Sequence, residues 1–117
     1  MLPAAARLRR SADFTDTLRA ARAARGDGMV VLHAAAGDPA TSAGAGARVG
    51  FVVPRAVGPA VTRNRVRRRL RHLLRDRLDR LPDGTRLVVR VLPAAAMSTS
   101  DQLGRALDRA LDRVVAS

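Results

Sequence analysis

Apolar side chains recur with a helical period in residues 58–81. They are spaced at steps of three, four and one, which places them on a single stripe of an α-helix. The stripe comprises Val66, Leu70, Leu73, Leu74, Leu78 and Leu81. Because such a stripe must be buried against a core, the pattern predicts an amphipathic helix docked on the rest of the chain.

A first helix is predicted over residues 11–25. Ser11 is a suitable N-cap, and glycines end the helical pattern after residue 25. Phe14, Leu18 and Ala21 share one face of this helix, and we expect Leu18 and Ala21 to lie in the core.

Strands are predicted where apolar residues dominate or alternate over short runs, at residues 29–35, 48–53 and 86–92. Residues 37–46 are small, polar and Gly-rich, which predicts a flexible hairpin loop between the first two strands. Residues 54–59 turn the chain toward the long helix, either as a turn or with one further short strand.

A last helix is predicted where Asp101 follows Ser98 by three residues, the spacing of a capping box. Its inward stripe comprises Leu103, Leu107, Ala110, Leu111 and Val114. The charges of its arginines and aspartates nearly cancel, so we interpret this helix as a structural element that covers the core. The elements follow the order α-β-β-(β)-α-β-α, which predicts one α/β domain over residues 1–117, an α+β sandwich with helices on a small mixed sheet.

Charge adds a functional expectation to this outline. All 22 basic residues are arginine and all 10 acidic residues are aspartate, giving a net charge of +12. Nine arginines and two aspartates fall in residues 58–81, so this stretch carries seven of the twelve net positive charges. The predicted helix would repel itself along its polar side unless an anion lay against it, so we expect a polyanionic partner. The alternative is a solvated helix whose charges only maintain solubility.

Composition limits the chemistry that the polypeptide can perform. The sequence contains no cysteine, which excludes disulfides and thiolate metal sites. The two histidines, His33 and His72, belong to no recognisable catalytic or metal-binding motif, so we expect neither catalytic residues nor metal ligands. No apolar run approaches membrane-spanning length, and we expect a cytoplasmic protein without membrane association. The Ala- and Arg-rich start could pass for an organelle transit peptide, which remains the alternative.

The long basic helix resembles a specific family signature. Gly58, Ala60, Arg63, Asn64, Arg65, Arg68, Arg69 and Arg71 reproduce the Gly-x-Ala-x-x-Arg-Asn-Arg-x-x-Arg-Arg-x-Arg pattern of the protein component of bacterial ribonuclease P. The RLRRSADF opening, the VGFVVPRAVG stretch and a VVR-containing strand are similar to that family as well. The resemblance therefore covers most of the chain in the family's order.

The resemblance implies a protein subunit of a ribonucleoprotein endoribonuclease. Such a subunit binds ribonuclease P RNA and the 5′ leader of precursor tRNA, and it assists removal of the leader. The RNA subunit carries the catalytic centre and most of the Mg²⁺, so the polypeptide alone is expected to be inactive, with no organic cofactor and no required protein oligomer. The resemblance also implies a left-handed crossover between the two parallel strands, against the usual hand.

The resemblance assigns two sets of site residues. RNA binding is expected of Arg63, Asn64, Arg65, Arg67, Arg68, Arg69 and Arg71. The leader cleft is expected to contain Phe14, whose ring would stack on a nucleotide, together with Arg55 and Arg90. The chain departs from the family at Leu18, where a second aromatic is common, and at Pro54 and Ala56, where the family usually has Ser and Lys.

Rival functions explain less of the sequence. A ribosomal or general RNA-binding module accounts for the charge but not for the signature. A DNA-binding protein would need varied base-reading side chains, whereas this helix is nearly all arginine. A protein-only nuclease would need clustered carboxylates, which the sequence lacks.

Overall fold

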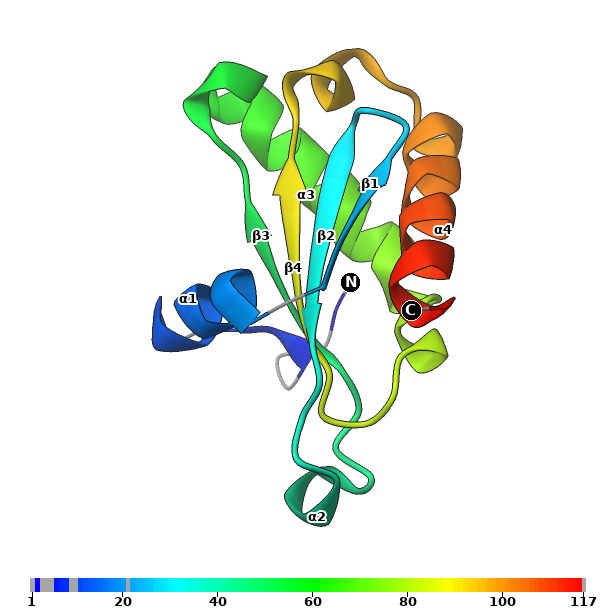
Figure 1. The fold of residues 1–117 in the computed structure, drawn as a ribbon. Helices are drawn as coiled ribbons and strands as arrows, with labels where there is room; N and C mark the ends of the chain where they lie inside the picture. Colours follow the sequence, from blue (N-terminus) through cyan, green and yellow to red (C-terminus); the bar gives the residue numbers. More distant parts are fainter. Residues whose placement is uncertain (1, 3–5, 9–10, 21, 117) are drawn as a thin grey trace.

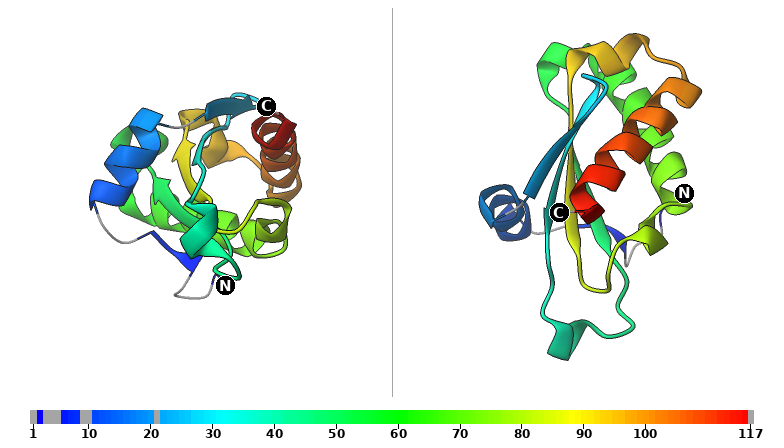
Figure 2. Two further views of the ribbon diagram at one scale, coloured as in Figure 1. Left: turned by 60° about the horizontal axis from the view of Figure 1, so that its bottom comes forward. Right: turned by 45° about the vertical axis from the view of Figure 1, so that its right-hand side comes forward.

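The computed structural model describes residues 2, 6–8, 11–20 and 22–116. Its helices and strands are α1 (Ser11–Ala20), β1 (Arg22–Gly26), β2 (Val30–Ala35), α2 (Pro39–Ser42), β3 (Arg48–Val52), α3 (Ala60–Arg75), β4 (Arg86–Val91) and α4 (Ser100–Ala116). Short 3₁₀ helices cover Arg55–Val57, Leu78–Arg80 and Pro93–Met97. Helix α1 lies on one face of the sheet, and α3 and α4 lie on the other, as Figures 1 and 2 show. The predicted fold class is therefore confirmed.

The four strands follow the order β1-β2-β4-β3. Strand β2 pairs antiparallel with β1 and β4, while β3 pairs parallel with β4. In Figure 1 both parallel strands run upward, β4 lies to the right of β3, and α3 crosses behind the sheet. This geometry is a left-handed crossover, as the family resemblance implied.

Residues 37–46 do not form the hairpin loop that was predicted, because β2 and β3 are not neighbours in the sheet. The segment instead passes the start of β4 and contains the short helix α2. It is attached to the turn before β4 by two hydrogen bonds, from Gly44 N to Asp83 Oδ2 (2.7 Å) and from Gly84 N to Gly46 O (2.8 Å). The predicted flexibility of the segment stays a prediction.

The first helix is shorter than predicted. It ends at Ala20, and Arg22–Gly26 forms the edge strand β1. Leu18 is 40% exposed, so its predicted core position was wrong, and the buried residue on this part of α1 is Thr17. Burial of Thr17 is possible because its hydroxyl donates to the Asp13 carbonyl at 2.6 Å. The side chain of Ser11 and all of Ala21 lie outside the described residues.

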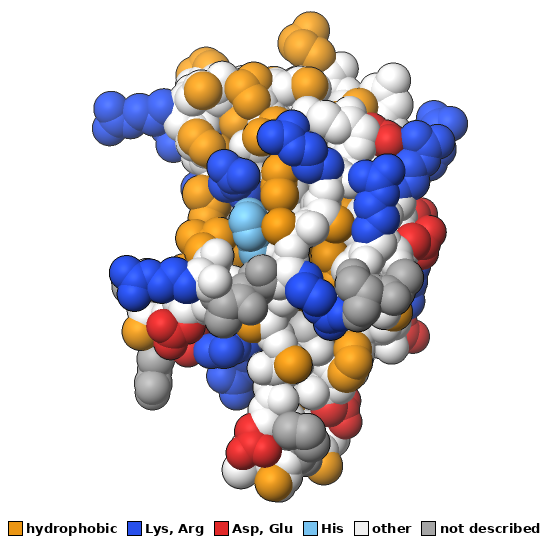
Figure 3. Space-filling view, viewed as in Figure 1, with side chains coloured by type: hydrophobic (Ala, Val, Ile, Leu, Met, Phe, Trp, Pro, Cys, Tyr) orange, Lys and Arg blue, Asp and Glu red, His pale blue; other side chains and the backbone are white. Residues whose placement is uncertain are grey.

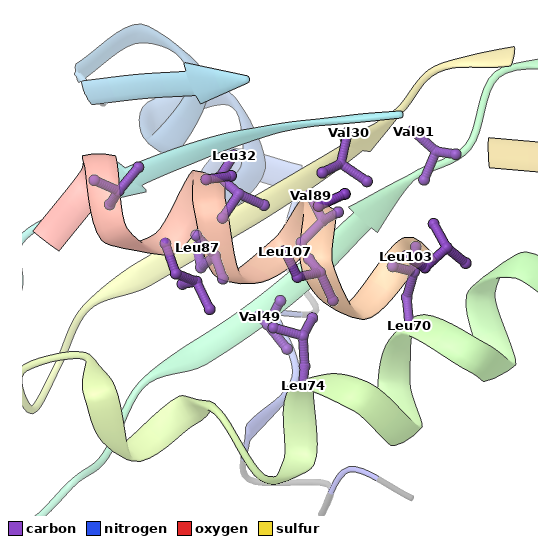
Figure 4. Close-up of a cluster of buried hydrophobic side chains, with 14 of the residues drawn as sticks. Val30, Leu32, Val49, Leu70, Leu74, Leu87, Val89, Val91, Leu103 and Leu107 are labelled. Carbon is purple, nitrogen blue, oxygen red and sulfur yellow. The ribbon is translucent and has the colours of Figure 1, made fainter. Parts of the chain in front are cut away.

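A core of aliphatic side chains fills the space between the sheet and the pair α3 and α4 (Figure 4). From α3 the buried residues are Val66, Leu70 and Leu74, and Leu81 beyond the helix is buried too. All five residues of the predicted α4 stripe are buried as well. Helix α3 itself ends at Arg75, and a 3₁₀ helix covers Leu78–Arg80. Both amphipathic patterns therefore predicted the buried faces correctly.

The caps and turns differ in detail from the predictions. The capping box of α4 is formed by Thr99 and Gln102: Gln102 N donates to Thr99 Oγ1 (3.1 Å), and Thr99 N donates to Gln102 Oε1 (2.8 Å). Ser98, predicted to cap the helix, is buried and donates to the Ala95 carbonyl at 2.7 Å instead. Residues 54–59 contain the 3₁₀ helix Arg55–Val57 and no further strand.

Asp108 on α4 joins that helix to the chain that follows α3. Its Oδ1 accepts hydrogen bonds from Arg77 Nε at 2.8 Å and Arg80 Nη1 at 3.2 Å. The hydrogen bond from Arg77 lowers the pKa of Asp108, burial opposes that effect, and the charges of Arg77 and Arg80 reinforce it. The carboxylate therefore stabilises the fold at neutral pH.

We expect Asp108→Asn to lower the free energy of unfolding by about 1 kcal/mol near neutral pH, a modest value because the side chain is 44% exposed and water screens the pair. The deficit should shrink as the pH falls through the lowered pKa of Asp108, because the parent then loses its carboxylate too. Urea denaturation over a range of pH measures this. Asp101→Asn, at an exposed position on the same helix, is the matched control, and equal losses in both variants would contradict the assignment.

Candidate nucleic-acid interface

The polar residues of α3 are divided among three sides of the helix. The outward side carries Asn64, Arg68, His72 and Arg75, the flank near β3 carries Arg63, Arg67 and Arg71, and the opposite flank carries Arg65 and Arg69. All four residues of the outward side are exposed, whereas the arginines on the flanks are partly buried. The helix thus presents cations over most of its circumference, apart from the stripe that faces the core.

Arg65 and Arg69 are nearer the core than Arg68, because both are partly buried whereas Arg68 is exposed. Arg65 Nη2 donates to the Ala96 carbonyl at 3.3 Å, and Arg69 Nη1 donates to the Ser98 carbonyl at 3.1 Å. These bonds attach the segment between β4 and α4 to α3. Both side chains therefore have a structural role, and both residues remain partly exposed.

The first residue of the signature, Gly58, is explained by its backbone conformation. Gly58 has a φ of +150°, and a Cβ there would lie 3.1 Å from Thr62 Cγ2. Its carbonyl oxygen accepts a hydrogen bond from Arg63 Nε at 3.1 Å. The glycine therefore allows the turn into α3, and the first arginine of the signature is held against that turn.

Arg71 lies over the ring of Phe51 on β3, with its guanidinium carbon 5.9 Å from the ring centroid. The pKa of Arg71 is lowered by burial first, and then by the charges of Arg7 and Arg67. Next to it, Arg67 Nη1 donates to Asn64 Oδ1 at 3.1 Å. This flank therefore concentrates positive charge beside the edge of the sheet.

The sheet face that carries α1 shows a regular arrangement of side chains across the strands. The strand register aligns His33 with Val88 and Gly50 in one row. The next row toward the ends of β3 and β4 contains Arg25, Val31, Arg90 and Val52. Figure 3 views this side of the molecule and shows arginine side chains surrounding apolar and uncharged surface. We call the surface formed by these two rows and α1 the cleft face.

Phe14 reaches the cleft face from α1. Its ring rests on Gly50: a Cβ at that position would lie 2.3 Å from Phe14 Cζ, so only glycine allows the ring to approach so closely. The ring is partly buried, and it remains partly open to solvent. An aromatic surface is therefore present at the floor of the cleft face.

The two arginines predicted for the leader cleft are both exposed. Arg90 pairs with Val52 in the row next to that of Gly50. Arg55 lies three residues beyond Val52 at the same end of the sheet. The fold therefore places Phe14 and Arg90 on one face, with Arg55 beyond the end of β3.

His33 is a residue of the cleft face to which the sequence assigned no catalytic or metal-binding role. It is partly buried, and its Nε2 is buried without a hydrogen-bond partner among the described residues. Burial lowers the pKa of His33, and the charge of Arg90 lowers it further. The alternation of β2 could have placed it opposite the core residues Leu32 and Ala34. The side chain is thus a neutral imidazole at neutral pH with an unused polar atom.

Replacing His33 with asparagine is expected to make stability less dependent on pH on the acidic side of 6.5. Because the folded-state pKa is lowered, the unfolded chain takes up a proton more readily, so the parent loses stability as the pH falls below 6.5 and the loss levels off below the folded pKa. Urea denaturation at several pH values measures the slope. Thr41→Asn, at an exposed position without a titratable group, should retain the parent's slope, and a similar change in both variants would contradict the prediction.

In the described part of the chain, no group of three or more His, Cys, Asp or Glu side chains could hold a metal ion. None of its helices has the length and apolar character needed to cross a membrane.

Comparisons with known proteins agree with the signature in α3. The family model described as Ribonuclease P matches residues 2–115. The ribonuclease P protein component of Salinispora tropica is 50% identical, with 95% of this chain and 91% of that protein aligned. The corresponding protein of a Nocardioides species is 51% identical over 97% of this chain and 95% of its own length.

Solved structures match the fold. The ribonuclease P protein of Staphylococcus aureus superposes with a TM-score of 0.78 at 19% identity, covering 92% of this chain and 94% of that one. The Thermotoga maritima protein gives 0.75 at 21% identity, covering 95% and 96%. The family model matches nearly the whole chain, and these relatives share about half of its residues. The chain therefore belongs to the family of ribonuclease P protein components, which are subunits of the RNA-protein endoribonuclease that matures the 5′ end of tRNA.

Proposed function

We propose that the chain binds ribonuclease P RNA through α3 and holds the 5′ leader of precursor tRNA on the cleft face. The observation that carries this proposal is the position of the family signature. Its arginines make the surface of α3 cationic, with Arg68 exposed and the flank arginines partly exposed, while the sheet face on the other side presents Phe14 and Arg90. The two surfaces are separated by the sheet, so one chain can contact two RNA segments at once.

The RNA-binding surface would comprise Arg63, Asn64, Arg65, Arg67, Arg68, Arg69 and Arg71. Arg68 and Asn64 on the outward side are exposed, and Asn64 Oδ1 accepts from Arg67 Nη1. Arg63, Arg65 and Arg69 on the flanks would add donors beyond the one that each gives to a backbone carbonyl. Guanidinium groups suit phosphate because they offer paired donors in one plane. Such contacts release counterions, so binding should weaken steeply with salt.

The leader would lie across the cleft face. Phe14 offers a ring on which any base can stack, and Arg90 and Arg55 offer charge to the backbone. Because mature tRNA lacks a leader, these contacts would make the affinity for precursor tRNA higher than the affinity for the product. Leu18 supplies no second aromatic, so stacking would depend on Phe14.

In this proposal the RNA subunit is the catalyst, and the Mg²⁺ ions that it would bind promote hydrolysis of the phosphodiester. The chain neutralises crowded phosphates and so lowers the Mg²⁺ concentration that the RNA needs. A cytoplasmic location, where bacterial tRNA precursors are made, forms part of the same proposal.

The test is cleavage of a precursor tRNA by a bacterial ribonuclease P RNA at low Mg²⁺, with the chain, without it, and with the chain alone. We expect strong stimulation and no activity of the chain alone. Phe14→Ala should mainly reduce the preference for precursor over mature tRNA, and Arg68→Ala should mainly weaken assembly with the RNA. Absence of stimulation by folded protein would contradict the proposal, and equal losses in both assays for both variants would contradict two separate surfaces.

A further inference from the structure

A cavity of about 500 Å³ lies where α3 ends and the chain enters β3. This volume is within the range of about 300–1,000 Å³ that small-molecule sites in proteins occupy. The floor of the cavity is apolar and includes Leu2 and Leu81, which are both buried. Its rim is polar and includes Arg75, Asp79 and Asp83, which are all exposed. The cavity therefore combines an apolar floor with hydrogen-bond donors and acceptors at its mouth.

The polar groups of the rim are available to a ligand. Arg75 forms one loose ion pair, from its Nε to Asp76 Oδ1 at 3.6 Å, and its Nη groups have no partner among the described residues. Asp79 takes part in none of the ion pairs found in the described part of the chain. Asp83 Oδ2 accepts from Gly44 N at 2.7 Å, which orients this carboxylate and leaves its other oxygen for a ligand. The rim thus offers one guanidinium and two carboxylates.

This combination selects against phosphate, because the two carboxylates would repel an anion. It suits a planar apolar group that carries N–H donors beside a carbonyl oxygen. Guanine has this pattern: its N1–H and N2–H₂ groups can donate to carboxylates, and its O6 can accept from a guanidinium. Adenine and cytosine each offer a single amino group, and uracil offers one N–H between two carbonyl oxygens. Guanine is therefore the base that matches one donor group and two acceptor groups at the rim.

We propose that this cavity binds one unpaired guanine base of the RNA partner, with its O6 on Arg75 and its N1 and N2 on the carboxylates of Asp79 and Asp83. The inference rests on the proposed function for its partner. Arg75 connects the cavity to the outward side of α3, where Arg68 and His72 are also exposed. The arginines of α3 would bind the RNA backbone whatever its sequence, and the cavity would add a position at which a base is read.

Asp79→Asn distinguishes guanine recognition from simple attraction between charges. If the carboxylate had no ligand, removing its negative charge would strengthen the binding of RNA to this cationic protein. If it accepts from guanine, we expect Asp79→Asn to weaken binding to ribonuclease P RNA by about tenfold, as for one lost hydrogen bond to a charged group. Asp76→Asn removes the same charge at an exposed position outside the cavity and should strengthen binding slightly. Tighter binding by both variants would overturn the proposal.

Chemical probing of the RNA identifies the base. Kethoxal reacts with N1 and N2 of unpaired guanine, which are the two atoms that the carboxylates would cover. We expect the protein to protect an unpaired guanine of ribonuclease P RNA, and we expect that guanine to react again with Asp79→Asn and with Ala45→Leu, whose larger side chain narrows the cavity. Ala43→Leu, at an exposed position of the same segment outside the cavity, should retain the protection. If no protected guanine depends on Asp79 and Ala45, the assignment to RNA is wrong.

Titration with guanosine 5′-monophosphate tests the cavity without RNA. The Gly44 amide donates to Asp83, so its ¹H–¹⁵N resonance reports on the rim. Guanosine 5′-monophosphate should shift this resonance to saturation in the parent and in Ala43→Leu, but not in Ala45→Leu. Inosine 5′-monophosphate, which lacks the N2 amino group, should bind about tenfold more weakly. Equal binding of the two nucleotides would overturn the recognition of guanine.

The two arms also separate the sources of the base. A response to guanosine 5′-monophosphate without a protected guanine in the RNA would assign the cavity to free guanine nucleotides and overturn its assignment to RNA. Failure of both arms would overturn the cavity as a base site. Stimulation of precursor cleavage tests the proposed function separately, because that assay can succeed whether or not the cavity binds guanine.

Discussion

Changing Arg67, Arg68 and Arg71 together to glutamine should weaken binding to ribonuclease P RNA by about 100-fold at physiological salt, because each lost phosphate contact removes about 0.7–0.9 from the slope of log affinity against log salt. The three side chains cover the outward side of α3 and the flank near β3, and none forms an ion pair with a carboxylate in the described part of the chain. Filter binding over a range of salt concentrations measures both the affinity and the slope.

The control for this triple variant removes the same number of charges elsewhere. Arg105, Arg109 and Arg113 lie on α4, and their replacement by glutamine lowers the net charge equally. We expect the α4 variant to lose less than about tenfold in affinity, through the weaker long-range field alone. Equal losses in the two triple variants would mean that binding depends on net charge and not on the surface of α3. Circular dichroism establishes that both variants are folded.

Gly50→Ala is expected to lower the free energy of unfolding by about 2 kcal/mol and to reduce the preference for precursor over mature tRNA. The reason is steric, since the new Cβ would lie 2.3 Å from Phe14 Cζ, closer than carbon atoms can approach. Either the ring or the whole of α1 must move, and both changes disturb the cleft face. Thermal unfolding and the ratio of the two tRNA affinities measure these effects.

A double-mutant cycle isolates that contact. In a Phe14→Ala background the ring is gone, so the loss of stability caused by Gly50→Ala should be clearly smaller, although Leu8 Cβ at 3.2 Å leaves a residual clash. Equal losses in both backgrounds would show that the cost of the alanine arises elsewhere, for example in the strand backbone.

Long amphipathic patterns were the parts of the fold that the sequence could predict well. Leu70 and Leu107 lie in runs whose period leaves one buried face, and the helices formed there. Strand β1 could not be predicted because four of its five residues, in RAARG, are arginine or alanine, which favour helix, and it contains no β-branched side chain. Its strand conformation is due to pairing with β2, where Ala24 lies opposite Leu32, and to the cover provided by α4. Tertiary contacts outweighed local propensity.

The composition of the candidate site was easier to predict than its geometry. The signature identified the arginines of α3, but not that Arg65 and Arg69 bind the carbonyls of Ala96 and Ser98, because those contacts depend on the segment after β4. The alternation of β2 could have placed His33 on the face away from the core, but its neighbours on that face depend on the register with β4. Contacts between segments distant in sequence require the fold to be known.

The segment between β2 and β3 offers a practical opportunity. Gly44 and Gly46 are held to the turn before β4, so the residues of α2 project beyond the two hydrogen bonds that secure the base of the segment. Figure 1 shows α2 at the end of the molecule away from the start of α3. A short insertion or a single cysteine for dye attachment at Ala40 or Thr41, both exposed, should therefore leave the sheet and both proposed RNA surfaces intact. With no cysteine elsewhere in the chain, such a label would be unique, and assembly with RNA could be followed one molecule at a time.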